Sequence, residues 1–313
     1  MLNPVHLRTL QAVLTCGSFA DAAIHLGYTA SAVSQQMSAL EKATGLTLFE
    51  RLPRSVHATS SAHYLVAAGT EIVLNLRSLE RDAKALAAGE QGGIRLGSFA
   101  TASTRILPSA LAAFTTAHPN VDVGLDEGEP EDLLPELLDG PLDVALVYAD
   151  SNRHVWPGSV AAVPLLVEER LLILPPGHPA HRPRKAVDLR ELRDATWVTS
   201  PKAPSLIRLC ASVGFEPRMA FCTNDFNTVC AFVQAGLGVA IMPELAFPSN
   251  IELRPLRVVP KPAQRHILAL YRHSNRNPAL PTMIDRLVAA ANEFPRVVPD
   301  DDSHWLDHIT SRR

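Results

Sequence analysis

The chain has 313 residues, of which 47% are hydrophobic and 19% are charged, and its formal net charge is −3. This composition excludes a disordered chain, and the length suits two or three domains with sizeable cores. The chain has no apolar run of about 18 residues, so we expect no membrane-spanning helix; polar residues within MLNPVHLRTLQAV argue against a signal peptide and favour a cytoplasmic protein.

Residues 1–60 predict three short helices followed by a hairpin. Leucines at helical spacing mark the first helix. Ser18 and Asp21 fit a capping box that starts the second helix, Gly27 ends it, and Thr29 can cap the third. The turn within LPRSV then fits a small wing. This order of elements is that of a winged helix-turn-helix.

The third helix has two distinct faces. The apolar positions that recur every three or four residues are Val33, Met37 and Leu40. The short polar side chains that recur on another face are Ser31, Ser34, Gln35 and Ser38. Short side chains let a helix backbone approach base edges in the major groove, where Gln pairs with adenine and Ser donates to phosphates or bases. An ordinary solvated face would be richer in Glu and Lys.

Positive side chains mark the predicted wing. Arg51, Arg54 and His57 fall there and would reach phosphates or the minor groove, although these residues taken alone are better explained by a solvated turn. Over residues 1–60, four Lys or Arg against three acidic residues leave a charge of only +1. Affinity for DNA must therefore depend on a dimer and on groove fit.

Residues 61–89 predict one long helix. The apolar positions that fall seven residues apart are Leu65, Ile72, Leu79 and Leu86. Such a heptad seam pairs helices between two chains. The alternative is a long helix that packs on its own domain, but the charged remainder RSLERDAK favours dimerisation.

Beyond a glycine-rich break at 89–93, apolar strand segments alternate with helical ones. The expected strands are IRLGS, VDVGL, DVALVY, RLLILP, WVTS, MAFCT, GVAIMP and HILALY. This alternation predicts an α/β region with a mostly parallel sheet over residues 92–295, whose size suits two lobes with a cleft between them. The polar segment 296–313 has no periodicity, and we expect it to be disordered.

The segment LRTLQAVLTCGSFADAAIHLGYTASAVSQQMSALEKATGLTLFER resembles the N-terminal domain of LysR-type transcriptional regulators. The motifs G-S-F-x-x-A-A, A-V-S-Q-Q-M-S-A-L-E and L-F-E-R match in order and spacing over residues 1–65. A looser likeness continues through the long helix to VQAGLGVAIMPELA. The resemblance implies a winged helix-turn-helix, a dimerising linker helix and a two-lobed effector domain like periplasmic binding proteins. It also implies tetramers on inverted-repeat operators and a small-molecule effector.

The resemblance and the helix faces together give a set of candidate DNA-contacting residues. They are Thr29, Ala30, Ser31, Ser34, Gln35, Ser38, Arg51, Arg54 and His57. Many members of the resembled family carry Arg where this chain has Gln35, and Gln or Arg-Pro type residues where it has Ala30 and Ser31. The resemblance therefore does not imply which bases these positions prefer.

The resemblance places an effector between lobe one, at 92–163 and 268–294, and lobe two, at 164–267. Hydroxyl-rich turns in GSFATASTRILP and VTSPKAPS and the acidic DEGEPED segment supply the candidate effector-binding residues Thr101, Ser103, Thr104, Glu129, Thr199, Ser200 and Lys202. Helix capping explains each hydroxyl singly as well as ligand binding does. Glu127 and Glu129 suggest a cationic or amine-bearing effector, and an acidic loop that caps the next helix is the alternative.

Two other protein classes fit part of the sequence. An enzyme could be built on the two-lobed α/β domain, but neither G-x-S-x-G nor G-x-x-x-x-G-K-[ST] occurs, and GLGVAI lacks the third glycine of a dinucleotide loop. A cytoplasmic small-molecule-binding protein would not need the helical N-terminal region. The four cysteines form no C-x-x-C pair and suggest buried free thiols. We expect no cofactor and no metal, and we expect as partners double-stranded DNA, a small-molecule effector and further copies of the chain.

Overall fold

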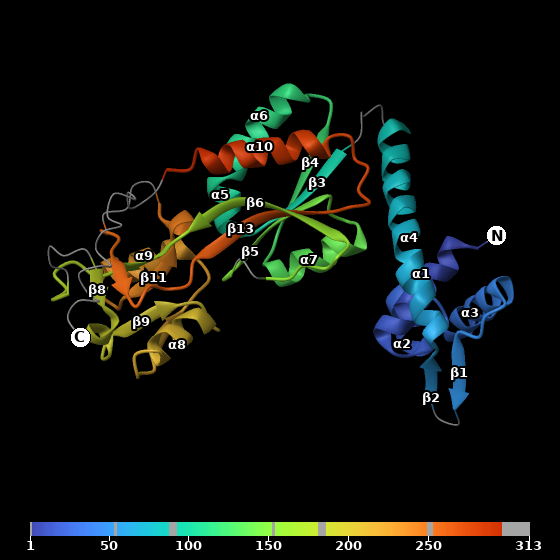
Figure 1. The fold of residues 1–313 in the computed structure, drawn as a ribbon, viewed down its shortest axis with the longest axis horizontal. Helices are drawn as coiled ribbons and strands as arrows, with labels where there is room; N and C mark the ends of the chain where they lie inside the picture. The colour runs from blue at the N-terminus through green and yellow to red at the C-terminus, as the bar shows by residue number, and fades with distance from the viewer. Residues whose placement is uncertain are drawn as a thin grey trace.

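The structure, a computed structural model, describes residues 2–52, 55–87, 93–151, 154–180, 186–248 and 253–295. It comprises an N-terminal helical unit, a long helix and two α/β lobes, which lie from right to left in Figure 1. The segment 296–313, for which the sequence predicts disorder, lies outside the described residues. None of the helices within the described ranges is long and apolar enough to cross a membrane.

The N-terminal unit is a winged helix-turn-helix. Its elements are α1 (Pro4–Cys16), α2 (Phe19–Leu26), α3 (Ala30–Thr44), β1 (Phe49–Leu52) and β2 (Ser55–Ala58). The two strands pair antiparallel and form the wing at the lower end of the unit in Figure 1. The order of elements predicted from the sequence is therefore confirmed.

Short polar residues and a glycine set the helix ends of this unit. Ser18 Oγ accepts a hydrogen bond from the Asp21 amide at 3.0 Å, and the same hydroxyl donates to the Asp21 carboxylate at 2.6 Å. Gly27 adopts φ 70°, a left-handed conformation that costs glycine little, and ends α2. Thr29 Oγ1 then accepts from the Ala32 amide at 3.2 Å and caps α3. The predicted turn between the two helices is confirmed by these contacts.

The long helix α4 (Ser60–Ala87) continues from the wing. Its first half packs on α1, where Ala62 and Val73 join the buried side chains of the N-terminal unit. Leu74, one residue further, is also buried, and its side chain approaches Gly140 of lobe one. Consecutive residues of α4 therefore contact the N-terminal unit and lobe one.

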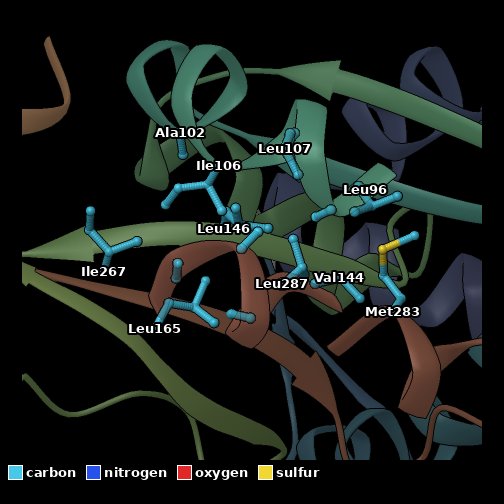
Figure 2. Close-up of a cluster of buried hydrophobic side chains, with 14 of the residues drawn as sticks. Leu96, Ala102, Ile106, Leu107, Val144, Leu146, Leu165, Ile267, Met283 and Leu287 are labelled. Atoms are coloured by element: carbon cyan, nitrogen blue, oxygen red, sulfur yellow. The ribbon is translucent and has the colours of Figure 1, made fainter. Parts of the chain in front are cut away.

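Lobe one contains a five-stranded sheet in the order β4-β3-β5-β13-β6. Its strands are β3 (Gly93–Ser98), β4 (Asp122–Glu127), β5 (Val144–Ala149), β6 (Val160–Glu168) and β13 (Arg265–Arg272). Its helices are α5 (Ala100–Arg105), α6 (Leu107–Ala117), α7 (Pro130–Asp139) and α10 (Leu280–Asn292). Helices α6 and α10 cover one face and α7 the other (Figure 1). Figure 2 shows the larger core, where Leu96, Ile106 and Leu287 meet over the sheet.

Lobe two is built from three short strand pairs, β10 with β9, β11 with β7 and β12 with β8. Its strands are β7 (Arg170–Ile173), β8 (Ala186–Asp188), β9 (Thr196–Thr199), β10 (Arg218–Cys222), β11 (Ala240–Pro243) and β12 (Arg257–Val259). Its helices are η1 (Leu189–Leu192), α8 (Pro204–Ala211), α9 (Phe226–Gln234) and η2 (Glu244–Ala246). Isolated bridges, such as that between Trp197 and Val239, join the pairs. Trp197 is fully buried at the centre of this lobe.

Two features of the α/β region differ from the expectation. The sheet of lobe one is mixed, because β13 returns from lobe two and runs antiparallel to both β5 and β6, while the other four strands share one direction. The strands of this sheet also continue to Glu168 and resume at Arg265, beyond the expected limits at 163 and 268. The chain therefore crosses between the lobes at Glu168 and again at Arg265.

Candidate nucleic-acid interface and interlobe site

Helix α3 presents one buried and one exposed face. Val33, Met37 and Leu40 are buried in the cores of the N-terminal unit. Of the candidate DNA-contacting residues on or beside α3, Ser34 is half-buried, and those exposed are Thr29, Ala30, Ser31, Gln35 and Ser38. The helix is thus fixed by apolar contacts on one side while short polar side chains remain on the outside.

Some of these polar groups already have partners. Thr29 Oγ1 and Ser31 Oγ lie 3.0 Å apart, so the N-terminal turn of α3 is ordered by its own hydroxyls. Gln36, next to the candidate Gln35, accepts a hydrogen bond from the buried Thr9 hydroxyl at 2.5 Å and connects α3 to α1. Gln36 therefore acts in packing, whereas Gln35 points to the solvent-exposed side.

The wing is attached to α3 by a residue that the sequence analysis did not single out. Glu41 Oε1 accepts hydrogen bonds from the backbone amides of Leu48 and Phe49, at 2.7 and 3.3 Å. His57 is exposed on the second strand of the wing. The side chain of Arg51, and Arg54 as a whole, lie outside what the structure describes, so their predicted contacts stay predictions.

The predicted heptad seam on α4 is partly exposed in the single chain. Ile72 is 54% and Leu79 62% exposed, and Leu76 between them is also exposed. Leu65 differs, because it packs against the apolar cluster of its own N-terminal unit. The side chain of Leu86 is outside the described set. The exposed part of the seam is therefore the surface spanned by Ile72, Leu76 and Leu79.

The three candidate hydroxyls of lobe one differ in burial and in hydrogen bonding. Thr101 is buried, and its Oγ1 accepts a hydrogen bond from Arg265 Nη2 at 3.0 Å. Thr104 is exposed and donates to the Thr101 carbonyl at 3.2 Å. The Ser103 Oγ is enclosed and has no hydrogen-bond partner among the described residues. Thr101 therefore contributes to the packing of lobe one, where β13 begins.

Arg265 is the first residue of β13, where the chain returns to lobe one from lobe two. Its guanidinium lies over the rings of Tyr148 and Phe99, 4.2 and 4.9 Å from their centroids. The Tyr148 hydroxyl in turn donates to the candidate Glu129 at 2.7 Å. Burial and this carboxylate raise the pKa of Tyr148. Glu129 is thus already hydrogen-bonded within lobe one, and a role in binding a cationic effector stays a prediction.

A buried ion pair lies at the crossing between the lobes. Arg265 Nε is 2.8 Å from Glu168 Oε1, at an angle too poor for a hydrogen bond, so charge holds the two together. The Leu245 amide of lobe two donates to Glu168 Oε2 at 2.7 Å. Burial raises the pKa of Glu168, although Arg265 opposes it, and burial lowers the pKa of Arg265.

The candidate residues of lobe two lie just before α8. Thr199 is half-buried at the end of β9, and Ser200 and Lys202 are exposed. Helix α8 begins only at Pro204, so these side chains do not cap it. The hydroxyl that does make a contact between the lobes is Ser205, which donates to Asp150 of lobe one at 2.6 Å.

The cysteines and other potential metal ligands are dispersed. Cys210 and Cys230 are buried, and burial raises the pKa of each thiol to about 11. Cys222 is exposed and Cys16 half-buried, so the expectation of uniformly buried thiols is wrong for these two. In the described ranges, no group of three His, Cys, Asp or Glu side chains could hold a metal ion.

Comparisons with known proteins cover both halves of the chain. Residues 4–63 match the family described as bacterial regulatory helix-turn-helix protein, lysR family, and residues 87–292 match the LysR substrate binding domain. The HTH-type transcriptional regulator CfxR of Cupriavidus necator is 32% identical over 249 residues, which cover 77% of this chain and 76% of that protein. CbbR of Xanthobacter flavus is 28% identical and covers 97% of this chain and 93% of its own length.

Solved structures give the same architecture. The Corynebacterium glutamicum OxyR C206 mutant has a TM-score of 0.54 and 26% identity, and 93% of each chain is covered. Full-length CbnR complexed with its target DNA has a TM-score of 0.52 and 23% identity, and the match covers 92% of this chain and 100% of that one. At 23% identity the likeness to CbnR shows the shared fold alone.

Proposed function

The chain belongs to the LysR family of bacterial transcriptional regulators, and on that premise we propose that it binds an inverted-repeat operator as a dimer or tetramer. We further propose that a small molecule between the two lobes controls it. The relatives reported above are named transcriptional regulators and not enzymes. The DNA-binding and substrate-binding domains are those of the family, whereas the operator, the oligomer and the effector are proposals for this chain.

The observation that carries the DNA-binding part of the proposal is the exposed face of α3. Gln35 and Ser38 are exposed opposite the buried Val33 and Met37, which fix the helix in its unit. The match of residues 4–63 to the bacterial regulatory helix-turn-helix family supports DNA binding by this unit. Gln35 is the residue best suited to read a base, because its amide can pair bidentately with adenine.

The proposed dimer rests on α4. Ile72, Leu76 and Leu79 form an apolar face that is exposed in the single chain, whereas Val73 and Leu74 are buried within it. Two copies of this face would cover each other as in a coiled coil. A symmetric dimer would then present two copies of α3 to the two halves of an inverted repeat.

The test is a gel-shift titration of the full chain with the intergenic DNA upstream of its own gene, with and without candidate ligands. We expect a specific shift that a ligand alters. Gln35→Ala should weaken operator binding by about 1–3 kcal/mol and leave binding to unrelated duplex DNA nearly unchanged. Equal losses on both DNAs would contradict base reading by Gln35. Ligand binding without any DNA binding would favour a small-molecule-binding protein.

A further inference from the structure

Asp150 of lobe one is held by three side chains of lobe two. It directly follows β5, and its Oδ1 lies 2.5 Å from Arg170 Nη2, on the first residue of β7. Its Oδ2 accepts from Ser205 Oγ at 2.6 Å and from Arg208 Nη2 at 3.4 Å, both on α8. The carboxylate therefore bridges the lobes at a place separate from the Glu168–Arg265 pair.

The contacts of this cluster join two cations to one anion. Two guanidinium groups, Arg170 and Arg208, contact the single carboxylate of Asp150, and Arg170 also lies within the field of the buried Glu168. Ser205 is the second residue of α8, so the positive end of the helix dipole adds to the same potential. A cluster of this kind is suited to an oxyanion, which accepts hydrogen bonds from guanidinium and hydroxyl donors.

Exposure rises across the cluster. The Arg170 side chain is 13% exposed, that of Asp150 32% and that of Arg208 66%. A solute can therefore reach Arg208 and Ser205 from solvent, whereas Arg170 is fixed deeper by a further hydrogen bond to the Ala263 carbonyl. The contact of Asp150 with Arg208 is long and solvated, and such contacts are replaced at little cost.

The Glu168–Arg265 pair, on neighbouring lobe-one strands where the chain crosses to lobe two, has the opposite character. Glu168 and Arg265 are both buried, and a buried charge is costly to leave without its partner. The buried Glu168–Arg265 pair can therefore fix the point where the chain crosses between the lobes. The more exposed contact of Asp150 with Arg208 can be replaced by another anion. The Asp150 contact is therefore a replaceable connection between the lobes, whereas the buried pair fixes the two lobe-one strands at the crossing.

We propose that Arg170, Ser205 and Arg208 form a subsite for a carboxylate or phosphate group of the effector, and that Asp150 occupies it as an internal counter-ion when no effector is bound. The inference rests on the proposed function in one respect, that an effector binds between the lobes. An arriving oxyanion takes the hydrogen bonds of Ser205 and Arg208 in place of Asp150, which turns to solvent. The charge of this ligand group is opposite to that suggested by Glu127 and Glu129.

Calorimetric titration of the full chain at low ionic strength, with inorganic phosphate and with succinate as probes, tests this subsite. Asp150→Ala removes the internal competitor and should tighten binding of at least one probe about tenfold. Asp150→Asn keeps the shape of the side chain but removes its charge, and it should also tighten binding of the probe. Arg208→Ala in either background should abolish the gain, because its exposed side chain supplies the accessible cation.

Arg190→Ala is the matched control. The Arg190 side chain is 59% exposed, and its guanidinium lies 3.4 Å from the Asp188 carboxylate, the same separation as between Arg208 and Asp150. Unlike that pair, Arg190 and Asp188 both belong to lobe two. This variant should bind the probes as the unchanged chain does. Tightening for succinate alone would assign a carboxylate, and tightening for phosphate alone would assign a phosphate.

The proposal is overturned if both Asp150 variants bind the probes no more tightly than the unchanged chain, or if Arg208→Ala keeps the gain. Operator binding is measured separately by gel shift on the same proteins. Failure of the unchanged chain to bind its upstream DNA would count against the proposed regulator function, and the anion titrations would still decide the subsite.

Discussion

Asp150 is ionised more readily in the folded chain than an ordinary aspartate. Burial alone would raise its pKa, but the hydrogen bonds from Ser205 and Arg170 outweigh burial and hold the pKa below its usual range. A depressed pKa means that the folded chain binds this proton less tightly than the unfolded chain does. The bond between the lobes therefore contributes to stability only while the carboxylate is charged.

The first prediction concerns the pH dependence of this contribution. It is fully present above the unfolded pKa of about 3.9 and is lost as the pH falls through the lower folded value. We expect the difference in unfolding free energy between the unchanged chain and Asp150→Asn to be constant from about pH 5 to 7 and to shrink below about pH 4. Urea denaturation at each pH measures it. A difference that stays constant down to about pH 3 would contradict this assignment.

Some candidate residues could be identified from sequence spacing, and others could not. The exposed positions of Gln35 and Ser38 can be predicted from helical periodicity, because the residues of both faces of α3 lie within one short stretch of sequence. The contacts between the lobes join Asp150 to Arg170 and Arg208 across the chain. No local pattern marks such pairs. For this reason the hydroxyl-rich turn at Thr101 looked like a ligand site, whereas its hydroxyl is bonded to Arg265.

At the scale of elements, strands with a regular apolar pattern were predictable and interrupted ones were not. All eight segments expected to be strands form strands. The sequence does not predict β6, because Pro164 interrupts it; the strand tolerates proline at the sheet edge, beside a register shift opposite Ile267 and Leu268. β8 and β12 have only three residues each, too few for a period to be recognised.

The attachment of the wing to α3 gives the second prediction. Glu41→Ala removes the acceptor for the Leu48 and Phe49 amides and should release the start of the wing. We expect weaker operator binding and a shallower dependence of affinity on salt, because wing contacts to phosphate would be lost. Glu41→Gln keeps an acceptor oxygen and should restore most of both. A salt slope unchanged in Glu41→Ala would show that the wing does not depend on this contact.

The crossing between the lobes gives the third prediction. Arg265→Ala leaves the buried Glu168 carboxylate without its cation and should lower the free energy of unfolding by about 3–5 kcal/mol. The control is Arg190→Ala, which breaks an exposed pair and should cost less than about 1 kcal/mol. Urea denaturation monitored by circular dichroism compares them. Similar losses of unfolding free energy in the two variants would mean that the buried Glu168–Arg265 pair stabilises the fold no more than an exposed pair does.

At the scale of the whole molecule, the exposed apolar face of α4 favours association with a second copy of the chain. A single chain leaves Ile72 and Leu79 largely in water although Val73 and Leu74 beside them are buried. Burial of such side chains is worth roughly 1.5–3 kcal/mol each, so pairing of two helices along this face would stabilise a dimer. Because α4 packs on the N-terminal unit, such a dimer would hold two copies of that unit together.

The fourth prediction tests this arrangement by sedimentation velocity. Leu79→Glu places a charge in the proposed seam and should convert the chain to smaller species, with loss of specific operator binding. Val155→Glu is the control, because Val155 is 88% exposed on the connection between β5 and β6 and is not part of the α4 seam. It should sediment as the unchanged chain does. A Leu79→Glu protein of unchanged size would place the self-association surface elsewhere.

The register of β6 and β13 has a consequence for how this architecture can vary. Glu168 and Arg265 face each other across the two strands, at the points where the chain leaves and re-enters lobe one. The apolar clusters of lobe two are formed by residues between Leu171 and Val258. Lobe two is therefore an insert within a hairpin of lobe one, and a loop of about two to five residues would join the same two strands. The whole of lobe two can thus be replaced during evolution by a different insert while the sheet of lobe one keeps its structure.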